Sequence, residues 1–107
     1  LAIPDNNTQG VSHGLEAADA GTIASLSVSV NIAHPYRGDL KVWLEHNGVQ
    51  TVLHDRTGSY QDNLIATYDV SDFNGAALTG TWSLHVADTA AHDTGTLVSW
   101  RLDVVTE

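Results

Sequence analysis

Strict alternation between apolar and polar residues runs through most of this chain, and it constrains the fold more than any other feature. Over residues 25–32 four aliphatic side chains alternate with small polar ones: Leu26, Val28, Val30 and Ile32 against Ser25, Ser27, Ser29 and Asn31. A period of two places the two sets on opposite faces of a β-strand, one buried and one in water. Similar alternation recurs over residues 40–45, 64–70, 82–86 and 98–104, and no segment shows the 3.6-residue period of a helix. The pattern therefore predicts an all-β protein.

The clearest local prediction is a β-hairpin centred on Asn47-Gly48. These two residues favour the two-residue type I′ turn, whose twist matches that of the flanking strands. The register that follows pairs five residues on each side: His46 with Val49, Glu45 with Gln50, Leu44 with Thr51, Trp43 with Val52, and Val42 with Leu53. In this register Val42, Leu44 and Leu53 face the core. Trp43 and Val52 then share the outer face.

The chain is long enough for one domain, which we assign to residues 1–107. A chain of 107 residues buries roughly two-thirds of its unfolded surface on folding. Turn-forming residues separate the predicted strands at about the spacing of an antiparallel sandwich or barrel, and no linker or repeat interrupts them. Because the chain begins at Leu1 and contains no methionine, we expect it to be part of a longer precursor. No apolar run is long enough for a membrane span, and no signal peptide is recognised.

The charge of the chain excludes two classes of partner. The chain has thirteen acidic residues and only four basic ones, which gives a formal charge of −9. Nucleic acids and anionic membranes are bound through basic surfaces that displace counterions, so neither is expected as a partner. Polyvalent cations remain attractive ligands.

No motif for catalysis is present. The chain has no cysteine, no G-x-S-x-G, no H-E-x-x-H and no glycine-rich phosphate loop, so we predict that it is not an enzyme. Six histidines are scattered without a zinc-binding spacing. We expect them to be solvent-facing residues of strands and loops: His13, His34, His46, His54, His85 and His92.

The aspartates point to calcium. Ten of the thirteen acidic residues are aspartates, and most lie in turns, where a carboxylate and the neighbouring carbonyl oxygens can serve as calcium ligands. The competing interpretation is that aspartates in turns bond only to their own backbone. Asp88 and Asp93 flank one short loop and form the tightest pair. Two carboxylates on one loop repel each other unless a cation or hydrogen-bond donors lie between them.

The tryptophans divide into two groups by phase. Trp82 and Trp100 alternate in phase with the apolar residues of their segments, which predicts positions in the core or at its edge. Trp43 is out of phase, so Trp43 and Val52 are the candidates for binding a partner. An exposed tryptophan on a small β-sandwich also fits a carbohydrate-binding module.

Five separated motifs give the chain a family resemblance. In chain order they are Ile3-Pro4-Asp5-Asn6, residues 34–40, Asp62-Asn63, residues 80–84, and residues 93–97 together with Ser99-Trp100. Together they resemble the P domain, or Homo B domain, of proprotein convertases, in the bacterial form that follows subtilisin-like serine proteases and some metalloproteases. The resemblance covers nearly all of the chain and implies an eight-stranded antiparallel jelly-roll β-sandwich without catalytic residues.

The resemblance also implies calcium and suggests its ligands. The first choice is Asp39, Asp88 and Asp93, and the second is Asp5, Asp62 and Asp69. The alternation of strand ends in a jelly roll predicts two groups of aspartates. One end would hold Asp5, Asp39, Asp55 and Asp62, and the other Asp19, Asp69, Asp72, Asp88 and Asp93.

By this resemblance the chain is an accessory domain of a secreted protease that stabilises the catalytic domain or assists its folding, and helps to bind protein substrate. The expected partner is the catalytic domain of the same precursor, a serine endopeptidase or alternatively a metalloprotease. A different hypothesis is a stand-alone module that binds carbohydrate or collagen through Trp43.

Overall fold

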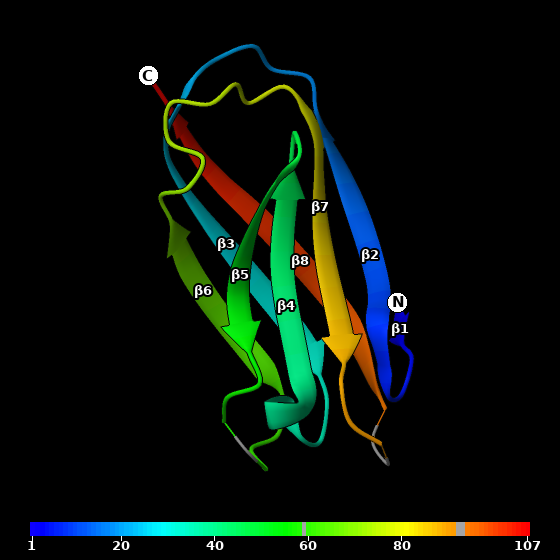
Figure 1. Cartoon of the computed structure of the whole chain (residues 1–107). Coiled ribbons are helices and arrows are strands. Elements are labelled where there is room, and N and C mark those ends of the chain that lie inside the picture. Colours follow the sequence, from blue (N-terminus) through cyan, green and yellow to red (C-terminus); the bar gives the residue numbers. More distant parts are fainter. Residues whose placement is uncertain (59, 92–93) are drawn as a thin grey trace.

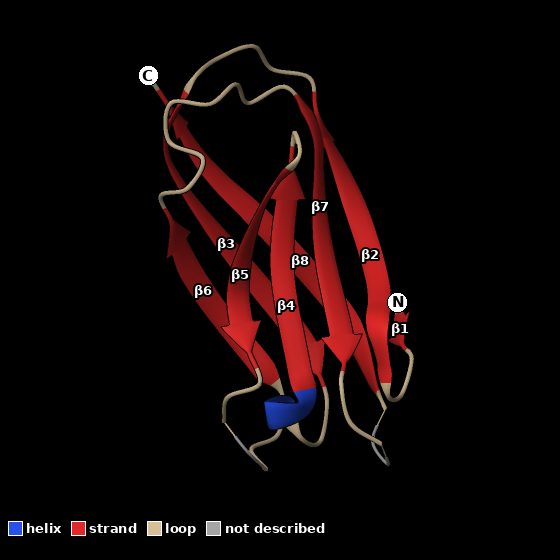
Figure 2. Ribbon diagram, viewed as in Figure 1, coloured by secondary structure: helices blue, strands red, loops and turns tan. Residues whose placement is uncertain are grey.

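Eight strands form two antiparallel sheets in the computed structural model of the protein, which describes residues 1–58, 60–91 and 94–107. The strands are β1 (Ala2–Ile3), β2 (Asn7–Ala17), β3 (Ile23–Ala33), β4 (Leu40–His46), β5 (Val49–Asp55), β6 (Leu64–Val70), β7 (Gly80–Asp88) and β8 (Gly95–Thr106). One 3-10 turn, η1 (Arg37–Asp39), precedes β4. Figure 2 shows this turn among the strands. The all-β prediction is confirmed.

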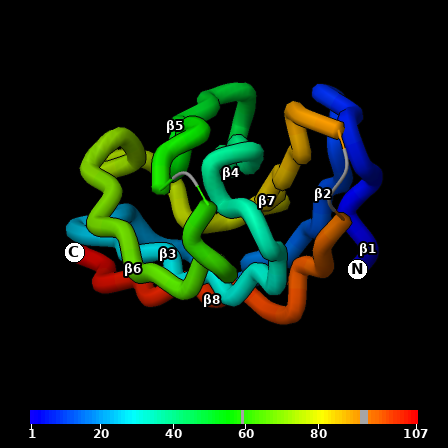
Figure 3. Tube along the Cα trace, turned by 90° about the horizontal axis from the view of Figure 1, so that it is seen from below, coloured from blue at the N-terminus to red at the C-terminus, as the bar shows by residue number. Residues whose placement is uncertain are grey.

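The strands are ordered β1-β8-β3-β6 in one sheet and β2-β7-β4-β5 in the other. Seen along the strands, the two sheets form the two layers of a sandwich (Figure 3). This order is compatible with the predicted jelly roll. The described part of the chain contains no helix with the length and apolar character needed to cross a membrane.

The inner faces of the two sheets form the core, as the alternation predicts. The aliphatic residues of β3 are buried while their serine neighbours are half-buried or exposed. Trp82 is fully buried in β7 and stacks on His46, with ring centroids 3.6 Å apart. Trp100 is half-buried against the edge of the core. Both tryptophans therefore lie where their phase predicts.

The hairpin forms with one change of register. Asn47 and Gly48 have the positive φ angles of a type I′ turn, 50° and 80°, and the four pairs next to the turn are as predicted. The prediction that Val42 faces Leu53 is wrong, because β5 contains one extra residue there and Val42 pairs with His54. This bulge turns His54 inward, where its Nε2 lies 3.0 Å from the carbonyl oxygen of Arg37.

The prediction of solvent-facing histidines is wrong for three of the six. His34, His46 and His54 are buried, each with a ring nitrogen within hydrogen-bond distance of a carbonyl or carboxylate oxygen: His34 to Asp88, His46 to Thr81 and Ala77, and His54 to Arg37. Burial of a polar ring is tolerated because these partners replace water. His13 is exposed and His85 is half-buried. His92 lies outside the described residues.

Candidate metal-binding end of the sandwich

The connections that follow β1, β3, β5 and β7 all lie at one end of the sandwich, the lower end in Figure 1. There the last residue of β7, Asp88, pairs with Asn7 of β2 and with Leu40 of β4. Four of the predicted ligand positions occur at this end: Asp5, Asp39, Asp62 and Asp88. Asp69 does not, because it lies in β6 opposite Ser27 of β3, towards the other end. Asp93 lies outside the described residues.

The predicted grouping of Asp88 with Asp19, Asp69 and Asp72 is therefore wrong. β7 runs antiparallel to β4, so the end of β7 returns to the place where β4 begins. Asp88 thus lies beside Leu40, the residue that follows Asp39. The connection after β7 lies at the same end as those after β1, β3 and β5. We call this end, which carries Asp5, Asp39, Asp62 and Asp88, the acidic end.

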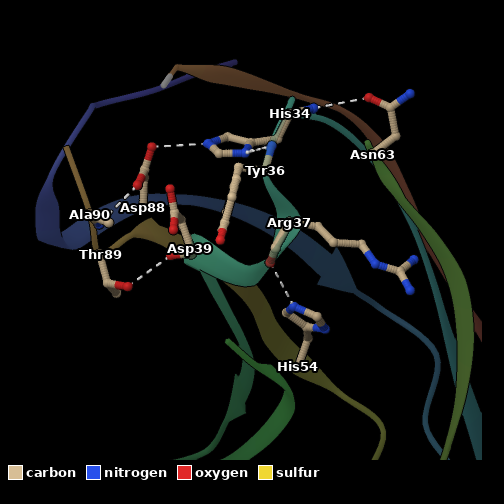
Figure 4. A network of polar contacts seen from close by, with 9 residues as sticks. All are labelled: His34, Tyr36, Arg37, Asp39, His54, Asn63, Asp88, Thr89 and Ala90. Carbon is tan, nitrogen blue, oxygen red and sulfur yellow. Dashed lines mark hydrogen bonds and ion pairs between the residues drawn. The ribbon is translucent and has the colours of Figure 1, made fainter. Parts of the chain in front are cut away.

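Asp88 and His34 form a buried pair at the centre of this end. Neither side chain is exposed, and the Nε2 of His34 lies 2.9 Å from the Oδ2 of Asp88. The second carboxylate oxygen accepts a hydrogen bond of 3.1 Å from the backbone N–H of Ala90. Figure 4 shows His34 reaching from the connection after β3 to the end of β7. The pair ties the connection after β3 to the one after β7.

The remaining bonds of His34 fix its tautomer. Its Nδ1 accepts a hydrogen bond of 3.0 Å from the backbone N–H of Tyr36, so the ring proton is on Nε2 and is donated to Asp88. The backbone of His34 also exchanges two hydrogen bonds with Asn63, of 3.0 and 2.7 Å. Both ring nitrogens are occupied by bonds inside the protein. The pair therefore fixes loop geometry and does not have the form of a general base directed at a substrate.

Asp39 is held by its backbone to the loop after β7. It ends the turn η1 and is half-buried. Its carbonyl oxygen accepts hydrogen bonds from both the N–H and the hydroxyl of Thr89, each 2.8 Å long. The structure thus places Asp39 and Asp88 on two loops that are bonded to each other (Figure 4).

Arg37 occupies the other side of the turn. Its side chain lies against Gly58, where an added Cβ would come within 2.3 Å of Nε. Arg37 also acts on Tyr68 of β6. Burial raises the pKa of the Tyr68 phenol above its ordinary value of 10.0, and the positive charge of Arg37 opposes that increase.

The described residues alone do not complete a metal site. In the described ranges, no three His, Asp or Glu side chains are grouped so that they could hold an ion. The carboxylate of Asp88 is already bonded to His34 and Ala90.

The second candidate surface, Trp43 with Val52, lies on the outer face of the other sheet. Val52 is 52% exposed and borders a groove of about 530 Å³ with Lys41, Gln50 and Arg56. The indole of Trp43 stacks on His85, with ring centroids 5.0 Å apart and planes within 4°. The ammonium of Lys41 lies 5.7 Å from its centroid. Trp43 thus packs against His85 and Lys41 on the outer face of this sheet.

Two structural residues of the acidic end were missed by sequence reasoning. His34 continues the phase of Val30 and Ile32, which is the signal that could have identified it as buried. Asn63 has a positive φ of 62°, and nothing in its local sequence indicates that it bonds to His34. The phase of a strand predicts burial, but it does not identify the partner across the fold.

Comparison with known proteins gives several relatives, among them two that are proteases by name. The chain is 40% identical over 103 residues to leupeptin-inactivating enzyme 1 of Streptomyces exfoliatus. It is 36% identical over 112 residues to a calcium-dependent protease of a Nostoc species, and 33% identical over 104 residues to the transglutaminase-activating metalloprotease of Streptomyces mobaraensis. These matches cover 94–95% of this chain but only 23%, 17% and 14% of the three relatives.

The same fold occurs in a solved structure, the serine protease of Aeromonas sobria. The superposition covers 99% of this chain and 24% of that protein, with a TM-score of 0.81 at 21% identity. The family model described as the proprotein convertase P-domain matches residues 23–104. With the motifs and the fold in agreement, the chain belongs to the family of proprotein convertase P-domains.

Proposed function

We propose that this chain is a non-catalytic accessory domain of an extracellular protease, and that it packs on the catalytic domain of the same polypeptide and stabilises it. The observation that carries the proposal is the difference in coverage between this chain and its relatives. The matches take in nearly the whole of this chain but less than a quarter of each relative. The His34–Asp88 pair supports a structural role, because both ring nitrogens of the histidine bond within the protein.

Removing the domain tests this proposal. We expect the protease precursor without residues 1–107 to yield little folded enzyme, or enzyme whose half-life at elevated temperature is at least about tenfold shorter. The measurement is residual peptidase activity after timed heating. Equal yield and equal half-life would contradict the proposed function.

We further propose that the surface formed by Trp43 and Val52 contributes to the contact with the catalytic domain or with protein substrate. Its support is the exposure of Val52 beside the groove. A Val52→Asp variant of the precursor tests this surface in the same heating experiment. Ile65→Asp serves as the matched control, because Ile65 is 69% exposed on the other sheet.

We propose a serine endopeptidase as the host enzyme, with a metalloprotease as the alternative. The names of the relatives do not decide between them, because one is called a metalloprotease and another only calcium-dependent. A sulfonyl fluoride that acylates catalytic serines would inactivate the first kind of enzyme. A zinc chelator used in excess calcium would inactivate the second.

We propose that calcium binds at the acidic end of the sandwich. Asp5, Asp39 and Asp62 lie on loops at that end, and calcium prefers carboxylate and carbonyl oxygens. The net charge of −9 favours a cation there, and one relative is called a calcium-dependent protease. Asp93, outside the described residues, is proposed as a further ligand alongside one or more of these aspartates. Asp88 contributes by holding the two loops together.

Calcium is expected to raise the melting temperature of the domain. At a concentration one hundred times its dissociation constant, a ligand that binds only the folded state adds about 2.7 kcal/mol to the free energy of unfolding. Calorimetry with calcium and then with excess chelator measures this change. Asp39→Asn should reduce the calcium-dependent shift, whereas Asp69→Asn, which removes the same charge at the other end, should leave it intact. No shift with the unmodified domain would refute the calcium proposal.

A further inference from the structure

One edge of β8 is almost unpaired. On one side β8 pairs with β3 along nearly its whole length. On the other side, in the described residues, it pairs only with the two-residue strand β1, through Ala2 with Thr96 and Ile3 with Gly95. The backbone of Leu1 adds two hydrogen bonds to Leu97, of 2.8 and 3.0 Å. Beyond Leu97 the edge continues for nine further residues of β8 without a strand beside it.

The direction of the free backbone groups follows from Leu97. Its side chain is buried, and its N–H and C=O both face β1. A bulge at Val98, which lies between the Leu97–Ile32 and Ser99–Asn31 pairs, shifts the alternation by one residue. After the bulge the half-buried residues are Trp100, Leu102 and Val104. Because residues on one face of a strand direct their backbone groups to the same edge, these three present their N–H groups to the open side.

The open side leads into a cleft between β8 and β2, lined by apolar side chains together with Glu16, Asp19 and Thr106. Leu15 and Ala17 of β2 face Leu102 and Val104 of β8 across a cavity of about 620 Å³. Leu1 lies beside the same edge of β8, opposite Leu97. It pairs with the buried Leu97 and is on the same face of the sheet, yet its side chain is 54% exposed. The inner face of the sheet thus continues past the point where β1 stops covering it.

We propose that, in the longer polypeptide, the residues immediately before Leu1 extend β1 along β8 and cover this cleft. The inference rests on the proposed function, in which the domain is one part of a protease chain. With Leu1 opposite Leu97 and the bulge taken into account, the second, fourth and sixth residues before Leu1 would pair with Trp100, Leu102 and Val104. Those three residues should be apolar, because their side chains would lie on the inner face of the sheet with Leu1 and Leu97, and the intervening ones polar. The connection to the catalytic domain would then be a strand of the sandwich.

Amide hydrogen exchange tests this extension directly. Two versions of the domain are compared by NMR, one beginning at Leu1 and one beginning ten residues earlier in the precursor. We expect the amides of Trp100, Leu102 and Val104 to exchange at least about tenfold more slowly in the longer version. The amides of Arg101 and Asp103, which face β3, should be protected in both and show that each version is folded.

A pair of proline variants in the longer version provides the matched control. Proline four residues before Leu1 removes an N–H that would bond to Leu102, so protection of Leu102 and Val104 should be lost. Proline three residues before Leu1 removes an N–H that faces solvent, so protection should remain.

Equal exchange at the three amides in both versions, or equal effects of the two prolines, would overturn the proposal. Protection in the shorter version that increases with protein concentration would also overturn it, since a second copy would then occupy the edge. None of these outcomes depends on whether the domain stabilises the protease.

Discussion

Replacing His34 by alanine is expected to lower the free energy of unfolding of the domain by about 3 kcal/mol. The substitution leaves the carboxylate of Asp88, which has no exposed surface, with only the N–H of Ala90 as a partner. Leaving a buried acceptor without its donor costs about 1–3 kcal/mol, and more when the acceptor is charged, because its desolvation is no longer compensated by the hydrogen bond. Urea denaturation followed by tryptophan fluorescence measures the change. Since small domains are stable by only about 5–15 kcal/mol, much of the total would be lost.

Two further variants separate the hydrogen bond from the volume of the ring. Glutamine at position 34 keeps an N–H that can reach Asp88, whereas leucine fills a similar volume without a donor. We expect His34→Gln to be more stable than His34→Leu. The reverse order would show that the buried hydrogen bond contributes nothing to stability. Substitution of the exposed pair of Arg101 and Asp103 is the control. Its removal should change the free energy of unfolding by only about 0–1 kcal/mol, because exposed salt bridges contribute little.

The double variant tests whether the two residues act as a unit. His34→Ala with Asp88→Ala removes the donor and the charge together. We expect its loss of stability to be smaller than the sum of the two single losses, because the buried carboxylate is absent. The difference measures how strongly the loops after β3 and β7 are coupled through this contact.

Most of the fold could be predicted because it depends on local pattern. The period-two alternation identified the inner and outer faces of β3, and Asn47-Gly48 identified the hairpin turn. The error at Leu53 has a physical reason. A bulge inserts one residue without changing the composition of the strand, so the alternation alone does not reveal it.

Much less of the site could be predicted, since it depends on contacts between distant segments. Asp88 was identified as important, but its partner is 54 residues away in the sequence. The phase of β3 and β4 could have shown that His34 and His46 are buried. It could not have shown that the Nε2 of His34 meets Asp88 while that of His46 lies 2.9 Å from a carbonyl oxygen, that of Ala77. The pairing of β7 with β4 also had to be known, because the antiparallel direction of β7 brings Asp88 to the same end of the sandwich as Asp39.

Gly10 is the position where the smallest possible substitution should have a large effect. β2 contains two extra residues between Asn7 and Val11, and the carboxamide oxygen of Asn7 accepts hydrogen bonds from the N–H groups of Gln9 and Gly10 within this bulge. Gly10 has a φ of +64°, and an added Cβ would lie only 2.0 Å from the carbonyl oxygen of Val86. A methyl group therefore cannot enter unless β2 moves away from β7.

Gly10→Ala is accordingly expected to lower the free energy of unfolding by about 2–5 kcal/mol, because the left-handed conformation and the overlap with β7 both add to the cost. Gly48→Ala is the matched control. Gly48 also has a positive φ, +80°, but nothing lies within 4 Å of the added Cβ, so only the conformational cost of about 1–2 kcal/mol applies. Urea denaturation of both variants under the same conditions measures the difference. Equal losses would mean that the backbone of β2 is free to shift, and that the close approach to Val86 does not hold the bulge in place.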